Sequence, residues 1–187
     1  MSETLDLSHH LLIAMPALAD DNFRHSVTYI CEHGEHGALG VIVNRPLTVT
    51  LGDLLEQVGL QPASDVIAGQ PVYGGGPVQP NACLILHRPL GQWNSSLPVT
   101  DEIGLTGSLD LLTAIARGEG PDDFLVCLGY AGWGAGQLEQ ELADNAWLTA
   151  PARLDVLFEL PVERRWRAAA ASIGVDLDLL PGRAGHA

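Results

Sequence analysis

Polar side chains stand at the ends of several apolar segments, where a folded chain could present them to a ligand. Asn44 and Arg45 end one such segment, and His87 ends another. Guanidinium, imidazole and amide groups donate hydrogen bonds to anions and to other polar ligands. These positions therefore predict ligand binding or the stabilisation of negative charge.

A glycine run forms the second group of candidates. Gly74, Gly75 and Gly76, followed by Pro77, come directly after the predicted strand 71–73. Backbone without side chains can approach a ligand closely, and its N–H groups can surround an anion. A glycine run after a strand is also a common structural feature, so both interpretations are open.

The stretch Cys127–Trp147 (CLGYAGWGAGQLEQELADNAW) organises the rest of the chain. A predicted strand, 124–130, runs into a glycine-rich turn that carries Trp133, and this turn opens an amphipathic helix. Gln137 and Glu141 lie one turn apart on the same helix face. The first turn of a helix offers unpaired N–H groups and the positive end of the dipole. The place could hold an anion or a polar ligand, or it could be a tight packing corner.

These groups would form one cleft if the sheet gathers the strand ends on a single edge. Such a cleft would combine arginine, histidine and amide donors with an aromatic wall, and would suit a small anionic or polar ligand. The predicted ligand-binding residues are Asn44, Arg45, Gly74, Gly75, Gly76, Pro77, His87, Trp133, Gln137 and Glu141. The alternative is an enzyme for a small anionic or acyl substrate. In that case His33 or His87 is the base, and Arg45 with the glycine-run amides stabilises charge.

Recognised catalytic motifs are absent from the sequence. It contains no G-x-S-x-G nucleophile elbow, no phosphate-binding P-loop, and no G-x-G-x-x-G that leads from a strand into a helix. The chain has no lysine, which excludes Schiff-base chemistry. We therefore expect no cofactor, and we favour a non-enzymatic role.

Histidines and cysteines are the remaining candidates for metal or redox chemistry. His33 and His36 lie in one predicted hairpin and could join His87 in a zinc site, but the spacing is not that of the usual ligand sets, so we expect no metal. The cysteines are odd in number, lie in apolar segments and lack C-x-x-C spacing, which indicates buried reduced thiols. They are Cys31, Cys83 and Cys127.

The charge argues against nucleic acid as a direct partner. The formal net charge is −14, with nine basic residues against 23 acidic ones. Affinity for a phosphate backbone comes largely from cationic contacts. The basic cluster Arg164, Arg165 and Arg167 lies on one short predicted helix and is more typical of a solvated face. No apolar run reaches the ~18 residues of a membrane span, and the first residues lack the basic region of a secretory signal.

Apolar periodicity and turn residues predict an α+β fold with a mixed, largely antiparallel sheet in a single domain, 1–187. Residues 1–8 and the tail from Pro181 are expected to be loose. Thr50 should cap the first helix with help from Asp53, and 89–107 should be rich in loops. The predicted strands are 11–15, 26–33, 38–44, 71–73, 82–87, 124–130 and 154–159. The predicted helices are 51–58, 109–117, one opening near Gln137, and 161–173.

Four blocks in order resemble the YqgE/AlgH family of bacterial proteins. They are LLIAMPALADDNF, EHGEHGALGVIVNRP, PVYGGGPV and LGYAGWGAGQLEQELADNAW, and together they span Leu11 to Trp147. The resemblance implies a small barrel-like sheet surrounded by helices. It supplies no reaction and no catalytic residues, although the AlgH name carries a proposed role in transcriptional regulation. The predicted site residues apart from His87 belong to this family pattern, as do Pro46, Gly129 and Leu138.

The leading hypothesis is a cytoplasmic ligand-binding or regulatory protein. It would act on transcription indirectly, through an unknown protein partner or a small anionic ligand. Direct nucleic-acid binding is not expected, no membrane association is expected, and we predict a monomer.

Overall fold

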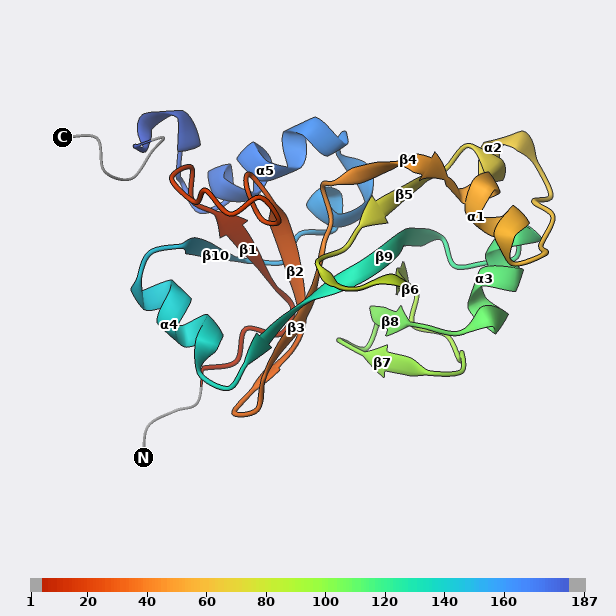
Figure 1. Ribbon diagram of the computed structural model, residues 1–187, viewed down its shortest axis with the longest axis horizontal. Helices are drawn as coiled ribbons and strands as arrows, with labels where there is room; N and C mark the ends of the chain where they lie inside the picture. Colours follow the sequence, from red (N-terminus) through yellow and green to blue (C-terminus); the bar gives the residue numbers. More distant parts are fainter. Residues whose placement is uncertain (1–4, 182–187) are drawn as a thin grey trace.

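The longest strand, β9 (Asp123–Gly134), runs through the middle of a strongly curled sheet and connects its two halves (Figure 1). It pairs antiparallel with β3 (Gly37–Ile42) on one side and with β6 (Val78–Arg88) on the other. Along part of its length it also pairs in parallel with β5 (Pro71–Gly74). The computed structural model describes residues 5–181.

The sheet has ten strands, and its main path runs β10-β1-β2-β3-β9-β6-β8-β7. All pairs are antiparallel except β5 with β9. The fold is therefore a mixed α+β single domain built on a curled half-barrel, as predicted. The strands not yet given are β1 (His10–Ala14), β2 (Val27–Gly34), β4 (Pro46–Thr50), β7 (Ser96–Pro98), β8 (Gly104–Thr106) and β10 (Trp147–Pro151).

The helices surround the sheet (Figure 1). Thr50 begins α1 in the predicted way, because its hydroxyl accepts the Asp53 N–H while the Asp53 carboxylate accepts the Thr50 N–H. No helix of residues 5–181 is long and apolar enough to cross a membrane. The helices are α1 (Leu51–Gln57), α2 (Asp65–Ala68), α3 (Leu109–Ala116), α4 (Gln137–Ala143), the π-helix η1 (Asp155–Glu159), α5 (Val162–Ala171) and the 3-10 helix η2 (Leu177–Leu179).

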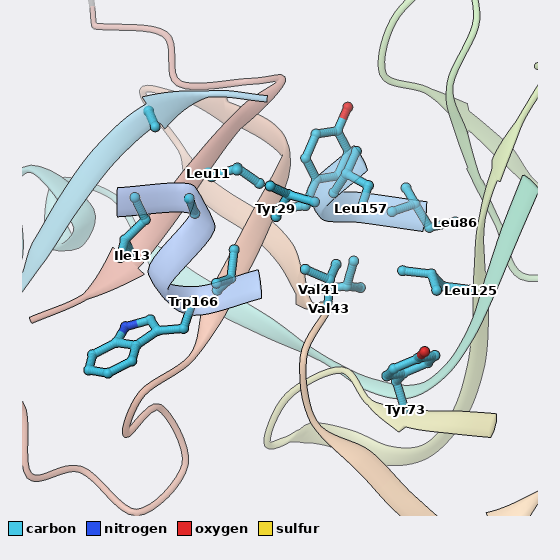
Figure 2. Close-up of a cluster of buried hydrophobic side chains, with 14 of the residues drawn as sticks. Leu11, Ile13, Tyr29, Val41, Val43, Tyr73, Leu86, Leu125, Leu157 and Trp166 are labelled. Carbon is cyan, nitrogen blue, oxygen red and sulfur yellow. The ribbon is translucent and has the colours of Figure 1, made fainter. Parts of the chain in front are cut away.

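The largest core cluster lies between strands of the sheet and the helices η1 and α5 (Figure 2). Leu11 and Tyr29 from neighbouring strands meet Leu157 from η1, and all three are buried. Trp166 of α5 donates its indole N–H to the Ala14 carbonyl at 2.9 Å, which attaches this helix to β1. Burial of each large apolar side chain contributes roughly 1.5–3 kcal/mol, so this cluster dominates the stability of the sheet.

Arg165 is a buried cation within this packing. Its guanidinium donates to the Val43 carbonyl at 2.6 Å and to the Leu160 carbonyl at 3.0 Å, and lies over the Tyr73 ring. Within residues 5–181 no carboxylate lies within 4.0 Å of it. Arg165 therefore ties α5 to the end of β3 and is not part of the solvated basic face expected from the sequence.

Several predicted elements differ from the structure. The segment 154–159 is a π-helix and not a strand; its adjacent Val156 and Leu157 are both buried, which an alternating strand on one face would not allow. The predicted turn Gly132–Gly134 is instead the end of β9, which pairs there with β3. Gly37 of β3 allows the two backbones to come close, because a Cβ at Gly37 would collide with the Trp133 carbonyl oxygen. Strands β4, β7, β8 and β10 were not predicted.

The chain start is only partly as expected. Leu7 is buried and its N–H donates to His33, so the lead is attached at this residue. Residues 1–4 and 182–187, which the prediction assigned to loose tails, lie outside the described residues.

Candidate functional site

The structure distributes the predicted site residues over three places along β9 and does not bring them into one cleft. Asn44, Arg45 and the glycine run lie at its middle, while Trp133, Gln137 and Glu141 lie at its C-terminal end. His87 pairs with Phe124 at the opposite end. Phe124 and Trp133 are separated by about 30 Å of strand at ~3.3 Å per residue. The strand ends therefore do not meet at one edge, because β6 and β3 pair with different parts of the same long strand.

Asn44 and Arg45 hold the loop before β2. The Asn44 amide accepts the Val27 N–H at 2.9 Å and donates to the His25 carbonyl at 2.9 Å. Arg45 donates through one terminal nitrogen to the Arg24 carbonyl at 2.7 Å and through the other to the Asn22 carbonyl. Both terminal nitrogens are thus used within the chain, which leaves little of Arg45 for an anion.

The glycine run is a close crossing of backbones. The Gly75 N–H donates to the Leu128 carbonyl and its carbonyl accepts the Ile42 N–H, both at 2.8 Å. A Cβ at Gly75 would collide with the Gly129 backbone, and one at Gly76 with the Tyr130 backbone. The run therefore packs the β5–β6 connection onto β9, while Pro77 is exposed beside it.

At the C-terminal end of β9, the carboxylate of Glu141 is the centre of a hydrogen-bond network. Its Oε1 accepts the indole N–H groups of Trp133 at 3.1 Å and Trp147 at 3.0 Å, and its Oε2 accepts the Gln137 amide at 3.0 Å. The Gln137 carbonyl oxygen accepts the Gly134 N–H at 2.9 Å. Phe23 contacts both indole rings. We call this set the Trp133 network; it fixes α4 against the ends of β9 and β10.

A histidine–carboxylate pair that the sequence reading did not connect lies beside this network. His33 Nδ1 accepts the Leu7 N–H at 2.9 Å, so Nε2 carries the proton and donates to Glu139 Oε1. The pKa of the Glu139 carboxyl is held below its usual value. The larger cause is the hydrogen bond from the backbone N–H of Glu139 itself, and the next is the hydrogen bond from His33. Both ring nitrogens of the buried His33 are engaged, which leaves neither free to act as a base.

A cavity of about 300 Å³ opens next to this pair at the β2–β3 hairpin. One wall is the Trp133 side of β9 and the other is the hairpin itself. We call it the hairpin cavity. Its lining residues are Glu32, His33, Gly34, His36, Gly37, Ala38, Leu39 and Trp133.

Metal and thiol chemistry find no support at the described positions. No group of three or more His, Cys, Asp or Glu residues within 5–181 is arranged to hold a metal ion. Burial raises the pKa of Cys83 to about 11 and of Cys127 to about 12, and it raises that of Cys31 further. All three thiols are free and stay protonated at neutral pH, as predicted for inert cysteines.

Comparison with known proteins identifies the family. The AlgH-like family model (DUF179) matches residues 11–178. A UPF0301 protein from Thioalkalivibrio sulfidiphilus is 56% identical over 188 residues, covering 100% of both chains. One from Nitrosococcus oceani is 52% identical, covering 96% of each.

Two solved structures share the fold. The solution structure of the AlgH protein from Pseudomonas aeruginosa is 49% identical with a TM-score of 0.80, covering 100% of this chain and 99% of that one. A crystal structure of a Corynebacterium diphtheriae protein has a TM-score of 0.74 at 20% identity, with 96% and 93% covered, and supports the fold alone. The chain therefore belongs to the AlgH-like family.

Proposed function

We propose that this chain is a cytoplasmic ligand-binding regulatory protein, and that a small polar ligand occupies the hairpin cavity. The observation that carries the proposal is the cavity of about 300 Å³ beside Trp133, whose walls are held by satisfied hydrogen bonds. A binding site needs walls that stay in place when it is empty. The Trp133 network supplies this on one side, and the His33–Glu139 pair supplies it on the other.

The lining indicates the class of ligand. Trp133 and Leu39 offer apolar surface, whereas Glu32 and the exposed His36 offer a carboxylate and an imidazole at the mouth. A flat, partly apolar molecule with hydrogen-bond donors fits this combination. The anionic ligand expected from the sequence has less support, because Arg45 donates to backbone carbonyls away from the cavity.

Regulation would pass from the cavity to a protein partner. The ligand would contact the hairpin and the end of β9 together, and would thereby change the surface that both present beside α4. The net charge of −14 disfavours contact with DNA, so an effect on transcription would be indirect. We propose that the chain acts as a monomer.

The experiment is a ligand screen on a variant whose cavity is filled. Gly34 lines the cavity, and a Cβ there has no atom within 4 Å, so Gly34→Met should fold normally while occupying the space. Glu35→Met places the same side chain on the exposed hairpin turn outside the lining and is the matched control. The panel comprises nucleosides, amino acids, aromatic amines and phosphorylated metabolites, and the readouts are thermal shift and tryptophan fluorescence.

We expect a ligand that stabilises the wild type and Glu35→Met by about 2.7 kcal/mol at a hundredfold excess over its Kd. The same ligand should leave Gly34→Met unchanged. Equal stabilisation of all three proteins would place the ligand elsewhere. A panel without any hit would remove the support for a small-molecule ligand. The link between the cavity and a protein partner is tested separately, by capturing the partner in the presence and in the absence of the ligand found. If Gly34→Met and Glu35→Met capture the same partner equally well under both conditions, the link is contradicted.

A further inference from the structure

A chain of side-chain hydrogen bonds connects three strands at the N-terminal end of β9, far from the hairpin cavity. The fully buried His87 of β6 lies 2.7 Å through Nε2 from Thr106 Oγ1 of β8. Thr106 Oγ1 lies 2.6 Å from Ser96 Oγ of β7. On its other side, His87 Nδ1 lies 3.0 Å from the Pro89 carbonyl oxygen. We call this chain the Ser96 relay; its strands lie beside α3 in Figure 1.

The direction of every proton in the Ser96 relay follows from its last member. A carbonyl oxygen only accepts, so His87 Nδ1 must carry the proton that faces Pro89. His87 Nε2 is then an acceptor, and the Thr106 hydroxyl must donate to it. Thr106 Oγ1 in turn accepts from the Ser96 hydroxyl. All donors therefore point from Ser96 toward His87, and the lone pairs of Ser96 Oγ are left facing outward.

Ser96 borders a second cavity. Its volume is about 520 Å³, and its lining residues are Leu90, Gly91, Gln92, Trp93, Asn94, Ser96 and Pro98. Trp93 Nε1 is buried without a hydrogen-bond partner, one of three such side-chain atoms found within the described chain. A buried donor without an acceptor costs about 1–3 kcal/mol. Gly91 lies against this nitrogen, since a Cβ there would come within 2.8 Å of it. The cavity thus has a nucleophile-type hydroxyl in its wall, while the Trp93 N–H has no exposed surface and does not reach the cavity.

The need to satisfy the buried His87 ring does not by itself explain why the hydrogen-bond chain continues as far as Ser96. One hydrogen bond from Thr106 satisfies Nε2, and the half-buried Ser96 could bond to water instead. Burial, which outweighs the opposing bond to Pro89, lowers the pKa of His87 and keeps the ring neutral at physiological pH. A neutral imidazole with its acceptor nitrogen turned toward a hydroxyl chain is able to take up a proton.

We propose that Ser96 is the nucleophile of an acyl-transfer site for small, largely apolar esters. Ser96 Oγ attacks the ester carbonyl carbon while its proton passes to Thr106 and the Thr106 proton passes to His87 Nε2. The tetrahedral oxyanion collapses, the bond to the leaving alcohol breaks, and that oxygen takes a proton from solvent water in the open cavity, because the esterified Ser96 has no proton to give and Thr106 is fully buried behind it. The hydroxide left by that water attacks the acyl-Ser96 ester and releases the acid, and the departing Ser96 oxygen regains its proton through Thr106 from His87 Nε2. Leu90 and Pro98 offer apolar surface to the acyl chain.

This site is independent of the hairpin cavity, so either proposal can fail without the other. The test is covalent labelling of the full chain with a fluorophosphonate, followed by intact-mass measurement and peptide mapping, together with hydrolysis of p-nitrophenyl acetate and butyrate. Ser96→Ala removes the nucleophile. Ser95→Ala is the matched control, because Ser95 is the adjacent exposed serine outside the cavity lining.

Two substitutions at Thr106 separate a proton relay from a purely structural role. Thr106→Val keeps the shape and removes the hydroxyl, whereas Thr106→Ser keeps the hydroxyl and removes a methyl group. We expect a single adduct on Ser96, absent in Ser96→Ala and unchanged in Ser95→Ala. Labelling should be about 100-fold slower in Thr106→Val and close to the wild-type rate in Thr106→Ser.

Three outcomes would overturn the proposal: no adduct on wild-type Ser96, an adduct that persists in Ser96→Ala, or equal labelling rates in Thr106→Val and wild type. Melting temperatures of all variants show whether they are folded under the assay conditions. If Thr106→Val is unfolded, the contrast of Ser96→Ala with Ser95→Ala and the rate of Thr106→Ser decide the question.

Discussion

The two ends of β9 hold buried histidines in opposite tautomers. His33, at the Trp133 end, accepts a backbone N–H through Nδ1 and donates through Nε2 to Glu139. His87, at the other end, donates through Nδ1 to a backbone carbonyl and accepts through Nε2 from Thr106. Both histidines follow apolar strand segments, so the sequence alone does not distinguish their roles. The backbone group that faces Nδ1 decides which histidine is a fixed donor and which can take a proton.

The hydrogen-bond networks around the two histidines also differ. At the Trp133 end, the polar side chains of the Trp133 network and of the His33–Glu139 pair have their partners within the chain, and the network closes on Glu141. At the other end, the chain of donors finishes at the half-buried Ser96 hydroxyl, which borders the second cavity. A closed network makes a rigid wall suited to binding, whereas an open one leaves groups that a substrate can engage. This contrast is the reason that we propose ligand binding at one end and acyl transfer at the other.

The largest expected effect tests whether the Trp133 network is closed around Glu141. Glu141→Ala leaves two buried indole N–H groups without an acceptor, so we expect it to lower the free energy of unfolding by about 3 kcal/mol. Urea denaturation followed by tryptophan fluorescence measures this. Gln140→Ala, on the exposed face of the same helix, should cost less than about 0.5 kcal/mol and is the control. Equal losses in the two variants would show that Glu141 does not hold the network.

A smaller loss of stability is expected from opening the Ser96 relay. Thr106→Val leaves the buried Nε2 of His87 without its donor and should cost about 2 kcal/mol in urea denaturation. Thr106→Ser should cost about 1 kcal/mol, through one lost methyl group. If the serine variant is the less stable of the two, packing outweighs the hydrogen bond and the proton order inferred for the relay loses its energetic support.

The smallest effect is on pH dependence and tautomer state. The pKa of His87 is lowered, so in the unfolded chain this residue takes a proton first as pH falls below its ordinary 6.5. Its contribution to stability is therefore complete above about pH 6.5 and declines as pH falls toward the folded pKa. Nitrogen-15 NMR of the rings should show a His87 midpoint below 6.5. It should also show the proton on Nδ1 in His87 and on Nε2 in His33; the same tautomer in both would contradict the comparison.

Local patterns in the sequence were sufficient for much of the fold. The Thr50 cap, the β2–β3 hairpin and helix α4 depend on residues within one or two turns of each other, and all were predicted. The strands β7 and β8 have three residues each, too few to show alternation in a segment rich in turn residues. Their existence depends on pairing with β6, which a local pattern does not contain.

The difference between local and long-range contacts also explains which parts of the candidate sites could be predicted from the sequence. Gln137 and Glu141 were paired correctly because helical spacing brings them together, and Trp133 was placed beside them. The His33–Glu139 pair joins residues 106 positions apart, and the contacts of Thr106 with His87 and Ser96 cross two strand pairs. His33 and His87 were singled out as candidate bases, but only the fold reveals what each ring nitrogen faces.

The position of β9 also determines how the chain must be assembled during synthesis. This strand lies between β3 and β6, yet it leaves the ribosome after both. Until residue 134 has emerged, the facing edges of β3 and β6 have no partner, and most long-range pairing of the sheet has to wait. Open strand edges are sites of intermolecular association. A nascent chain that stalls before β9 would therefore expose unprotected edges of β3, β5 and β6, and chaperone demand should fall sharply once this one strand is complete.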